Sequence, residues 1–306
     1  MEIKELKNLE KGDNVELVAR ISKVAFKTSA RGTEYCDFAL SDKGGEISAK
    51  MWTITNRDAL VLGNVLKVNG QIDTYRGVKS VVVNKVVKLD LEPDEFVVSA
   101  IPNVLEVKND LLILIESIES EQVRNMCLEA YKECKDRFDM HPAASGCHHA
   151  EKHGLLYHTE RMMKAADLLC GLYPVNRDVV LASIFFHDYG KMREMEPNEV
   201  WAGTYVKDSL LGHIYISATK VKEYVDAGKL DTELGFQIQH AILAHHGKLE
   251  YGSPVVPATK EAILVSKIDD LDAKMFAAET ELLKVEQGEM SERPNFCLDN
   301  ARIYNG

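Results

Sequence analysis

Histidine and aspartate side chains recur beside apolar stretches in the C-terminal two thirds of this 306-residue chain. The pair His187-Asp188 closes the apolar run 181–186, and His245-His246 closes another. Any one of them alone fits a hydrogen-bonded core residue, because a buried polar group without a partner is costly. Five such elements on expected helices instead predict a metal site, and imidazole and carboxylate without thiolate suit Mn, Fe, Co, Ni or Zn. The candidate ligands are His158, His187, Asp188, His213, His245, His246 and Asp269.

The segments that must position these side chains have the periodicity of helices. From residue 105 onwards apolar residues recur at helical spacing, and prolines mark the breaks between segments. We therefore expect an all-helical bundle, whose interior can assemble ligands from distant parts of the chain. The expected helices are 107–118, 121–138, 155–172, 177–186, 209–226, 234–244 and 259–283.

The first 90 residues have a different pattern, in which short β-rich segments are separated by turns. Five such segments between residues 14 and 89, with a short insertion between the third and the fourth, predict an OB-fold barrel. The expected fold class is multidomain, β followed by α. The expected boundaries are 1–90 for the barrel, 91–104 for a linker and 105–306 for the helical domain.

Aromatic and basic residues are interleaved in the predicted barrel. Such barrels hold single-stranded nucleic acid by stacking bases on exposed rings along a basic groove. Since strand alternation sends about half of the rings into the core, we select Tyr35 and Trp52 as candidate platforms. A barrel used for packing or for protein contacts is the alternative. The residues considered are Phe26, Tyr35, Phe38, Trp52 and Tyr75 with Lys27, Arg31, Lys50 and Arg76.

Charge is distributed unevenly over the chain. The formal net charge is 37 minus 48, or −11, but residues 1–90 have 15 basic and 12 acidic residues, a balance of +3. Because salt screens a charge beyond about 8–10 Å, the global sign does not exclude a nucleic-acid-binding barrel. No apolar run approaches the ~20 residues that span a bilayer, and the N-terminus lacks a signal-peptide pattern. We expect a cytoplasmic protein without a membrane partner.

The order H…HD…H…HH…D resembles the HD-domain metallohydrolase superfamily. The pattern extends beyond the ligands to the segments His148-His-Ala150, Gly154-Leu-Leu-Tyr-His158, Leu172-Tyr-Pro174, Asn176-Arg-Asp178, His187-Asp-Tyr-Gly-Lys191, Leu211-Gly-His213, His245-His-Gly-Lys-Leu-Glu-Tyr-Gly-Ser-Pro254 and Ile268-Asp-Asp-Leu-Asp-Ala-Lys274. With these segments the chain resembles the YhaM-type 3′→5′ exoribonucleases, which join an N-terminal OB-fold to a C-terminal HD domain. Tyr189 departs from that pattern, where an aliphatic residue is usual.

The resemblance implies a role for each candidate ligand. His158, His187, Asp188 and Asp269 match the ligands of one divalent metal. The histidines at 213 and 245 match those of a second metal, with Asp188 bridging, and His246 is a ligand or a second-layer partner. Two metals can activate water, neutralise the phosphoryl oxygens and stabilise the leaving oxygen, and we expect manganese, with Fe, Co, Ni or Zn as alternatives.

Three aspartates compete for the last ligand position. Asp269 falls where the family pattern places its ligand. Asp272, one helical turn further on, is a plausible partner behind the ligands. Asp270 points about 100° away from Asp269 around a helix and is the least suitable.

The resemblance implies hydrolysis of single-stranded RNA from its 3′ end to nucleoside 5′-monophosphates, with single-stranded DNA as a further substrate class. Asp188 and Lys191 are the expected catalytic residues, and Lys191 contacts substrate or donates a proton in relatives. Solvated surface charge is the alternative for Arg193 and Lys248. The expected substrate-binding residues are His148, His149, Arg193, Lys248, Tyr35 and Trp52.

Three other functions remain open from the sequence. One is an HD-type phosphohydrolase of a small nucleotide or cyclic dinucleotide. This function would give the barrel no obvious role. The second is a diiron oxygenase, which needs a redox-active iron pair. The third is a non-catalytic RNA-binding or docking protein with a structural metal site. Self-association as a homo-oligomer through residues 105–140 and 297–304 is a further expectation.

Overall fold

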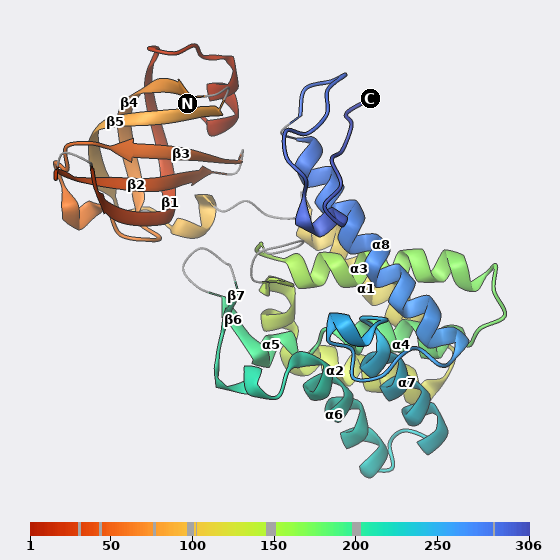
Figure 1. Ribbon diagram of the computed structural model, residues 1–306. Helices are drawn as coiled ribbons and strands as arrows, with labels where there is room; N and C mark the ends of the chain where they lie inside the picture. Colours follow the sequence, from red (N-terminus) through yellow and green to blue (C-terminus); the bar gives the residue numbers. More distant parts are fainter. Residues whose placement is uncertain are drawn as a thin grey trace. The chain divides into compact units, whose positions relative to one another are not determined.

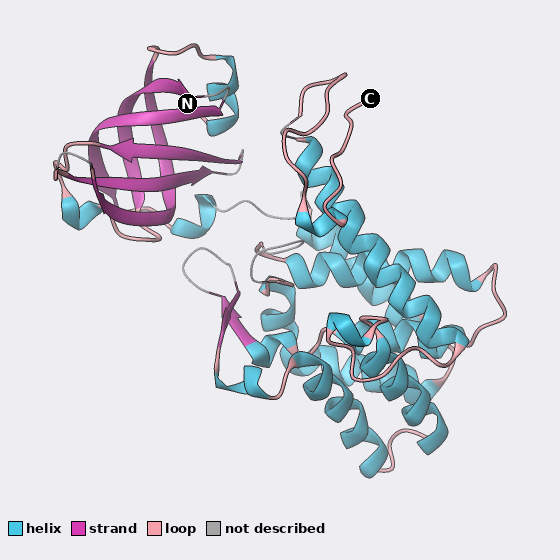
Figure 2. Ribbon diagram, in the orientation of Figure 1, coloured by secondary structure: helices cyan, strands magenta, loops and turns pink. Residues whose placement is uncertain are grey.

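The computed structural model describes residues 1–29, 32–42, 45–75, 78–96, 101, 103–144, 151–197, 203–283 and 285–306. Among these, residues 1–96 form one compact unit and residues from 101 onwards form a second. Figures 1 and 2 show that the first unit is built of strands and the second mainly of helices.

The first unit is a closed barrel with the strand order β1-β2-β3-β5-β4. β4 pairs with β1 to close the barrel, and β3 and β5 run parallel to each other. This topology confirms the predicted OB-fold. The strands are β1 (Asn14–Thr28), β2 (Glu34–Asp42), β3 (Gly45–Met51), β4 (Val65–Tyr75) and β5 (Val78–Leu89), with the 3-10 turns η1 (Ile3–Asn8), η2 (Arg57–Ala59) and η3 (Pro93–Phe96).

Alternation along β1 explains how the barrel closes around an apolar core. Val15, Leu17 and Ala19 are buried, whereas Glu16 between them is exposed. Since successive side chains of a strand point to opposite faces, this pattern places one face inside. Phe38 of β2 is also buried and belongs to this core.

The second unit is a helical bundle with one short two-stranded sheet (Figure 2). None of the helices in the described residues has the length and apolar character needed to cross a membrane. The elements are α1 (Val104–Glu116), α2 (Glu121–Met140), α3 (Gly154–Cys170), α4 (Arg177–His187), α5 (Lys191–Glu194), β6 (Met195–Pro197), β7 (Gly203–Tyr205), η4 (Lys207–Leu210), α6 (His213–Asp226), α7 (Thr232–Ala244), η5 (Leu249–Tyr251), α8 (Lys260–Leu282) and η6 (Phe296–Leu298).

Helix α4 lies at the centre of this bundle. Every residue from 179 to 187 is buried, and the helix contacts α3, α6, α7 and α8. Asn176 caps its start, because the side-chain oxygen accepts hydrogen bonds from the N–H groups of Asp178 and Val179 at 3.1 and 3.2 Å. The cap and the apolar run together hold His187, the last residue of the helix, in the interior.

The structure differs from the sequence expectation at two places. The helix predicted over 209–226 is divided, because Gly212 has φ +74°, outside the right-handed helical region. Helix α6 therefore begins at His213, which lies at a helix start rather than inside a helix. The ribbon formed by β6 and β7, which pair antiparallel, was not predicted and adds to the helical bundle.

Replacing Asn176 by Ala is expected to destabilise the helical unit by about 0.5–2 kcal/mol, because two N–H groups at the start of α4 lose their acceptor. Urea unfolding followed by circular dichroism measures this change. Lys222→Ala is the control, since it removes only the exposed ion pair with Asp226 and is expected to cost under about 0.5 kcal/mol. Equal effects of the two variants would contradict the role assigned to the cap.

Candidate metal centre

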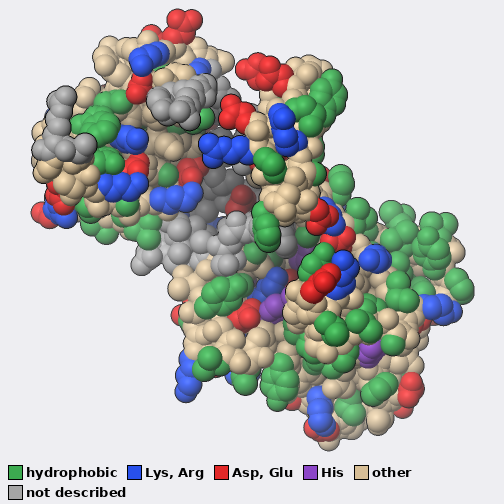
Figure 3. Space-filling model, in the orientation of Figure 1, with side chains coloured by type: hydrophobic (Ala, Val, Ile, Leu, Met, Phe, Trp, Pro, Cys, Tyr) green, Lys and Arg blue, Asp and Glu red, His purple; other side chains and the backbone are tan. Residues whose placement is uncertain are grey.

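The candidate ligands come from five helices that meet in the second unit. α3 carries His158, and α4 ends at His187 with Asp188 directly after it. The others stand at the first residue of α6, at the end of α7 and within α8 (Figure 1). Most of these side chains are buried, and Figure 3 accordingly shows only small areas of histidine surface.

The turn after α4 is held against the start of α6. The N–H group of Gly190 donates to Ser217 Oγ at 2.8 Å. A Cβ at residue 190 would lie 2.3 Å from the carbonyl oxygen of His213, so only glycine permits this approach. The close contact brings His213 toward Asp188, two residues before the glycine.

One group of ligand atoms forms around the Nε2 atoms of His158 and His187, which lie 3.2 Å apart. Asp188 Oδ2 is 3.3 Å from His187 Nε2 and 3.8 Å from His158 Nε2. Asp269 Oδ1 lies 3.2 Å from His158 Nε2 and 4.0 Å from His187 Nε2. Two imidazoles and two carboxylates therefore surround one point.

A second group forms on the other side of Asp188. Its Oδ1 atom is 3.5 Å from His213 Nε2 and 4.0 Å from His245 Nε2. The ring of His246 has its centroid 4.3 Å from that of His245 and 5.5 Å from that of His213. Since Asp188 turns one oxygen to each group, its carboxylate can bridge two cations.

All five histidines of the two groups are oriented by a hydrogen bond at Nδ1. Because a carbonyl or carboxylate oxygen only accepts, Nδ1 carries the proton and Nε2 is left to bind a metal. Such partners behind the ligands are typical of metal sites. The pairs are His158 with Asp272 (2.8 Å), His187 with Ile184 O (2.6 Å), His213 with Glu194 (2.8 Å), His245 with Ile242 O (2.6 Å) and His246 with Tyr251 O (3.0 Å).

Two buried atoms at the centre of this arrangement have no hydrogen-bond partner within the described part of the chain: Asp188 Oδ1 and His213 Nε2. Since buried polar atoms without partners are costly, a cation at this place resolves both. The donor set of imidazole nitrogens and carboxylate oxygens, without thiolate, fits hard or borderline divalent metals. The residues present therefore fit two divalent cations.

The charges of the buried site keep both aspartates ionised and call for positive charge beside them. Burial acts to raise the pKa of Asp188, but the charges of Lys191 and the neighbouring imidazoles hold it well below its ordinary value. The pKa of Asp269 is also lowered, against its burial, by the hydrogen bond with His158. Burial lowers the pKa of His245, so this imidazole stays neutral. Burial opposes protonation of His158, yet Asp269 and Asp272 raise its pKa to about 9. The second proton of this ring is then on Nε2, at the position where a cation would bind in its place.

Behind His158 lies a set of charges that the sequence analysis identified only in part. Asp272, which accepts from His158, also accepts from Arg161 Nε at 2.6 Å. Arg161 in turn donates to Glu279 at 3.0 Å. Arg161 stands three residues after His158 in α3, so the helical repeat offered a signal for it. Glu194, behind His213, had none, since β6, β7 and η4 lie between the two residues in the chain.

Lys191, predicted to be catalytic, and the predicted substrate-binding residues of the helical unit differ in their position relative to the metal centre. Lys191 Nζ lies 2.6 Å from Asp188 Oδ2, inside the centre. Arg193 faces away toward Asp208, with Nη2 2.8 Å from Oδ2. Lys248 interacts with neighbours of its own loop. His148 and His149 lie outside the described residues.

On the barrel, Tyr35 and Trp52 lie side by side. Their ring centroids are 4.7 Å apart with an interplanar angle of 32°, and Trp52 is 49% exposed. Lys50 Nζ lies 5.8 Å from the Trp52 ring. On the face shown in Figure 3, basic side chains lie among hydrophobic and acidic ones.

The other barrel residues considered are less suited to a base. Phe38 is in the core, Phe26 is covered by Arg57 at 3.9 Å, and Lys27 is paired with Asp37 at 2.5 Å. Arg31, Arg76 and the side chain of Tyr75 lie outside the described residues.

Known proteins are similar to this chain over nearly its whole length. Residues 155–274 match the model of the HD domain. The 3′-5′ exoribonuclease YhaM of Listeria welshimeri is 32% identical over 99% of this chain and 98% of its own length. The chain belongs to the YhaM family. The YhaM protein of Bacillus subtilis is 30% identical over 96% of each chain. A solved OB-fold domain of replication protein A from Methanococcus maripaludis is 15% identical, with a TM-score of 0.25, over 30% of this chain and 96% of that domain.

YhaM-family membership and the HD match make this a divalent-metal site. Asp272→Ala is expected to weaken metal binding by roughly 10–100-fold while the fold is retained, because His158 loses the acceptor that orients it. Isothermal titration with Mn²⁺ measures this affinity.

Asp270→Ala is the matched control for that titration. Asp270 lies on the same helix, is exposed and pairs with Lys274 instead of a ligand. Metal affinity in this variant should equal that of the parent. A loss of affinity as large as that of Asp272→Ala would exclude a specific role for Asp272.

Proposed function

We propose that this chain is a metal-dependent 3′-5′ exoribonuclease that shortens single-stranded RNA one nucleotide at a time. The observation that carries the proposal is the carboxylate of Asp188 between two histidine groups. YhaM relatives named as 3′-5′ exoribonucleases match over nearly the full length, so both units have counterparts in them.

The proposed reaction is hydrolysis of the last phosphodiester. Water adds to phosphorus, the bond to O3′ of the preceding nucleotide breaks, and that oxygen leaves with a proton. The products are a nucleoside 5′-monophosphate and an RNA shortened by one nucleotide. When bound, two divalent metals, which we propose to be Mn²⁺, supply Lewis acidity and lower the pKa of water.

The chain's own residues hold the charges that this reaction requires. The five imidazoles and the carboxylates of Asp188 and Asp269 bind the cations in a fixed geometry. Lys191, whose side chain is only 13% exposed, places an ammonium group beside Asp188. This group can neutralise the scissile phosphate or donate the proton to the leaving O3′.

We further propose that the barrel holds the RNA strand through Tyr35 and Trp52. These rings lie on the β2–β3 side, the face on which OB-folds bind oligonucleotides. An exposed ring pair beside Lys50 suits stacking of unpaired bases next to a phosphate. The ring pair favours a polymer over the small nucleotides that the sequence left open as substrates.

The first test uses 5′-end-labelled single-stranded RNA, Mn²⁺ and the full chain on a denaturing gel. Products that shorten steadily from the 3′ end are expected with the parent. Asp188→Ala should give no products and contain much less metal, because each cation loses its shared ligand. Intact RNA with the parent, or equal activity of the variant, would refute the proposed function.

Trp52→Ala tests the barrel. Loss of one stacking platform is expected to cost about 1–3 kcal/mol, or roughly 5- to 150-fold in the Kd for single-stranded RNA. Fluorescence anisotropy with labelled RNA measures this change, and Val61→Ala, at another exposed apolar position of the barrel, is the control. Unchanged RNA affinity in Trp52→Ala would remove Trp52 from the proposed surface.

A further inference from the structure

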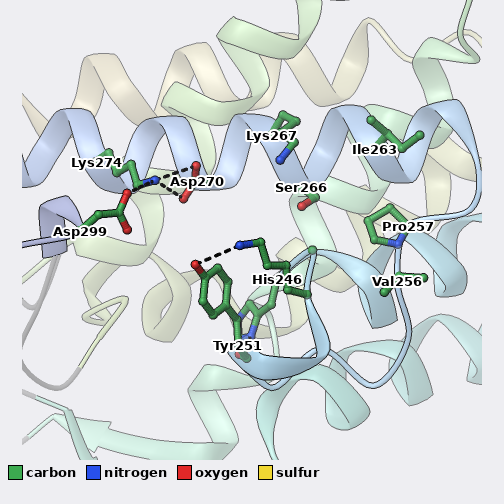
Figure 4. A pocket seen from close by; sticks show the side chains of 12 residues that line it. His246, Tyr251, Val256, Pro257, Ile263, Ser266, Lys267, Asp270, Lys274 and Asp299 are labelled. Carbon is green, nitrogen blue, oxygen red and sulfur yellow. Dashed lines mark hydrogen bonds and ion pairs between the residues drawn. The ribbon is translucent and has the colours of Figure 1, made fainter. Parts of the chain in front are cut away.

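A cavity of about 560 Å³ lies beside the second histidine group. Helix α8 forms one wall, and the segment from His246 to Pro257 forms the other (Figure 4). His246 is shared between the cavity and the histidine group, since its ring contacts His213 and His245 on one side and lines the cavity on the other. A ligand in the cavity is therefore contiguous with the metal centre.

The two ends of the cavity differ in chemistry. Val256, Pro257 and Ile263 lie together at one end in Figure 4 and form an apolar surface. At the other end Lys274 lies between two carboxylates, 3.1 Å from Asp270 and 2.8 Å from Asp299. One end suits a flat apolar ring, and the other suits polar hydroxyl groups.

The charges that line the cavity are nearly balanced. Lys274 is neutralised by its two aspartates, and Lys248 interacts with Glu250 and the Tyr251 hydroxyl, both at 3.3 Å. Lys267 is the lining lysine that has no hydrogen bond or ion pair among the described residues. It stands on α8 between the two ends (Figure 4). A ligand with several phosphates would need more free cations than this cavity has.

The volume of the cavity limits the size of its ligand. Sites for small ligands measure about 300–1,000 Å³, and the value here lies in the lower half of that range. A single base with its ribose fits such a space. The apolar end, the balanced charges and the connection to the metal centre all match a neutral nucleoside whose 5′-phosphate lies at the metals.

We propose that this cavity receives the 3′-terminal nucleoside of the RNA, with its base against Val256, Pro257 and Ile263. Lys267 donates a hydrogen bond to an acceptor on the base or ribose. The proposal rests on the proposed function, since it assigns the part of the substrate that becomes the released mononucleotide. Because one nucleoside fills the cavity, each cleavage removes one nucleotide.

Val256→Trp tests the cavity by filling it. Val256 is 53% exposed, so a larger side chain is accommodated without disturbing the core. The variant is expected to bind as much Mn²⁺ as the parent but to shorten RNA at least about tenfold more slowly. Val255→Trp, at the neighbouring position outside the cavity lining, should match the parent. A Val256→Trp variant that shortens RNA at the parent's rate would overturn the proposal.

Binding of adenosine 5′-monophosphate to the Mn²⁺-loaded protein gives a second measurement that does not depend on RNA cleavage. Lys267→Ala should raise the Kd roughly tenfold, because a hydrogen bond from a charged donor is lost. Lys260→Ala is the control on the same helix, since Lys260 bonds to the carbonyl of Pro174 outside the cavity. An unchanged Kd in Lys267→Ala would remove Lys267 from the site.

The two measurements separate the two proposals. If the parent shortens RNA but the Val256 and Lys267 variants behave like it, the cavity assignment fails and the exoribonuclease function stands. If the parent leaves RNA intact yet binds adenosine 5′-monophosphate through Lys267, the exoribonuclease function fails and the cavity is a site for free mononucleotides. If adenosine 5′-monophosphate does not bind, the cavity assignment is refuted.

Discussion

The burial of the Asp188 carboxylate among imidazoles is the constraint on which the rest of the helical unit depends. Asp188 is only 2% exposed, and a buried charge is tolerated only when it is paired or binds a cation. Helix α4 delivers this residue to the interior, and every other ligand helix contacts α4. The packing of the helices around α4 therefore also positions the ligands of the site.

Ligands of this centre come mostly from the ends of helices. His187 and His245 lie at helix C-termini, and His213 begins α6. Helix ends allow the chain to turn immediately after a ligand, so that Lys191 can follow Asp188 by three residues and contact the same carboxylate. The reactive groups therefore lie close together although they come from different helices.

Much of this organisation could be predicted from the sequence, because the types of the ligand residues and their order along the chain do not depend on where each helix begins and ends. Five strands and their order followed from alternation and turn residues, and the helical unit followed from apolar periodicity. The metal chemistry around Asp188 was predicted because several imidazoles and carboxylates stand beside apolar helical segments, where buried polar groups need a partner or a cation. A resemblance to a known family then related those residues to one another.

What could not be predicted depends on contacts between distant residues. The pairing of Glu194 with His213 arises only when the chain packs and has no local pattern. The spacing of Arg161 from His158 places both on one face of α3, but it does not indicate the contact of Arg161 with Asp272 on another helix. The ribbon of β6 and β7 is three residues per strand, too short for alternation to indicate. The break at Gly212 was missed because apolar periodicity continues on both sides of it.

The hydrogen bonds at Nδ1 have a consequence for how the centre acquires its metal. His187 and His245 each bond to a carbonyl three residues earlier in their own helix, so their ring orientation is determined by local helix geometry before any cation arrives. The conformational entropy of ordering these rings is lost on folding and not on binding. Metal selection should then follow from which ion fits a preformed set of donors, since the rings cannot rotate to suit the ion without breaking a buried hydrogen bond.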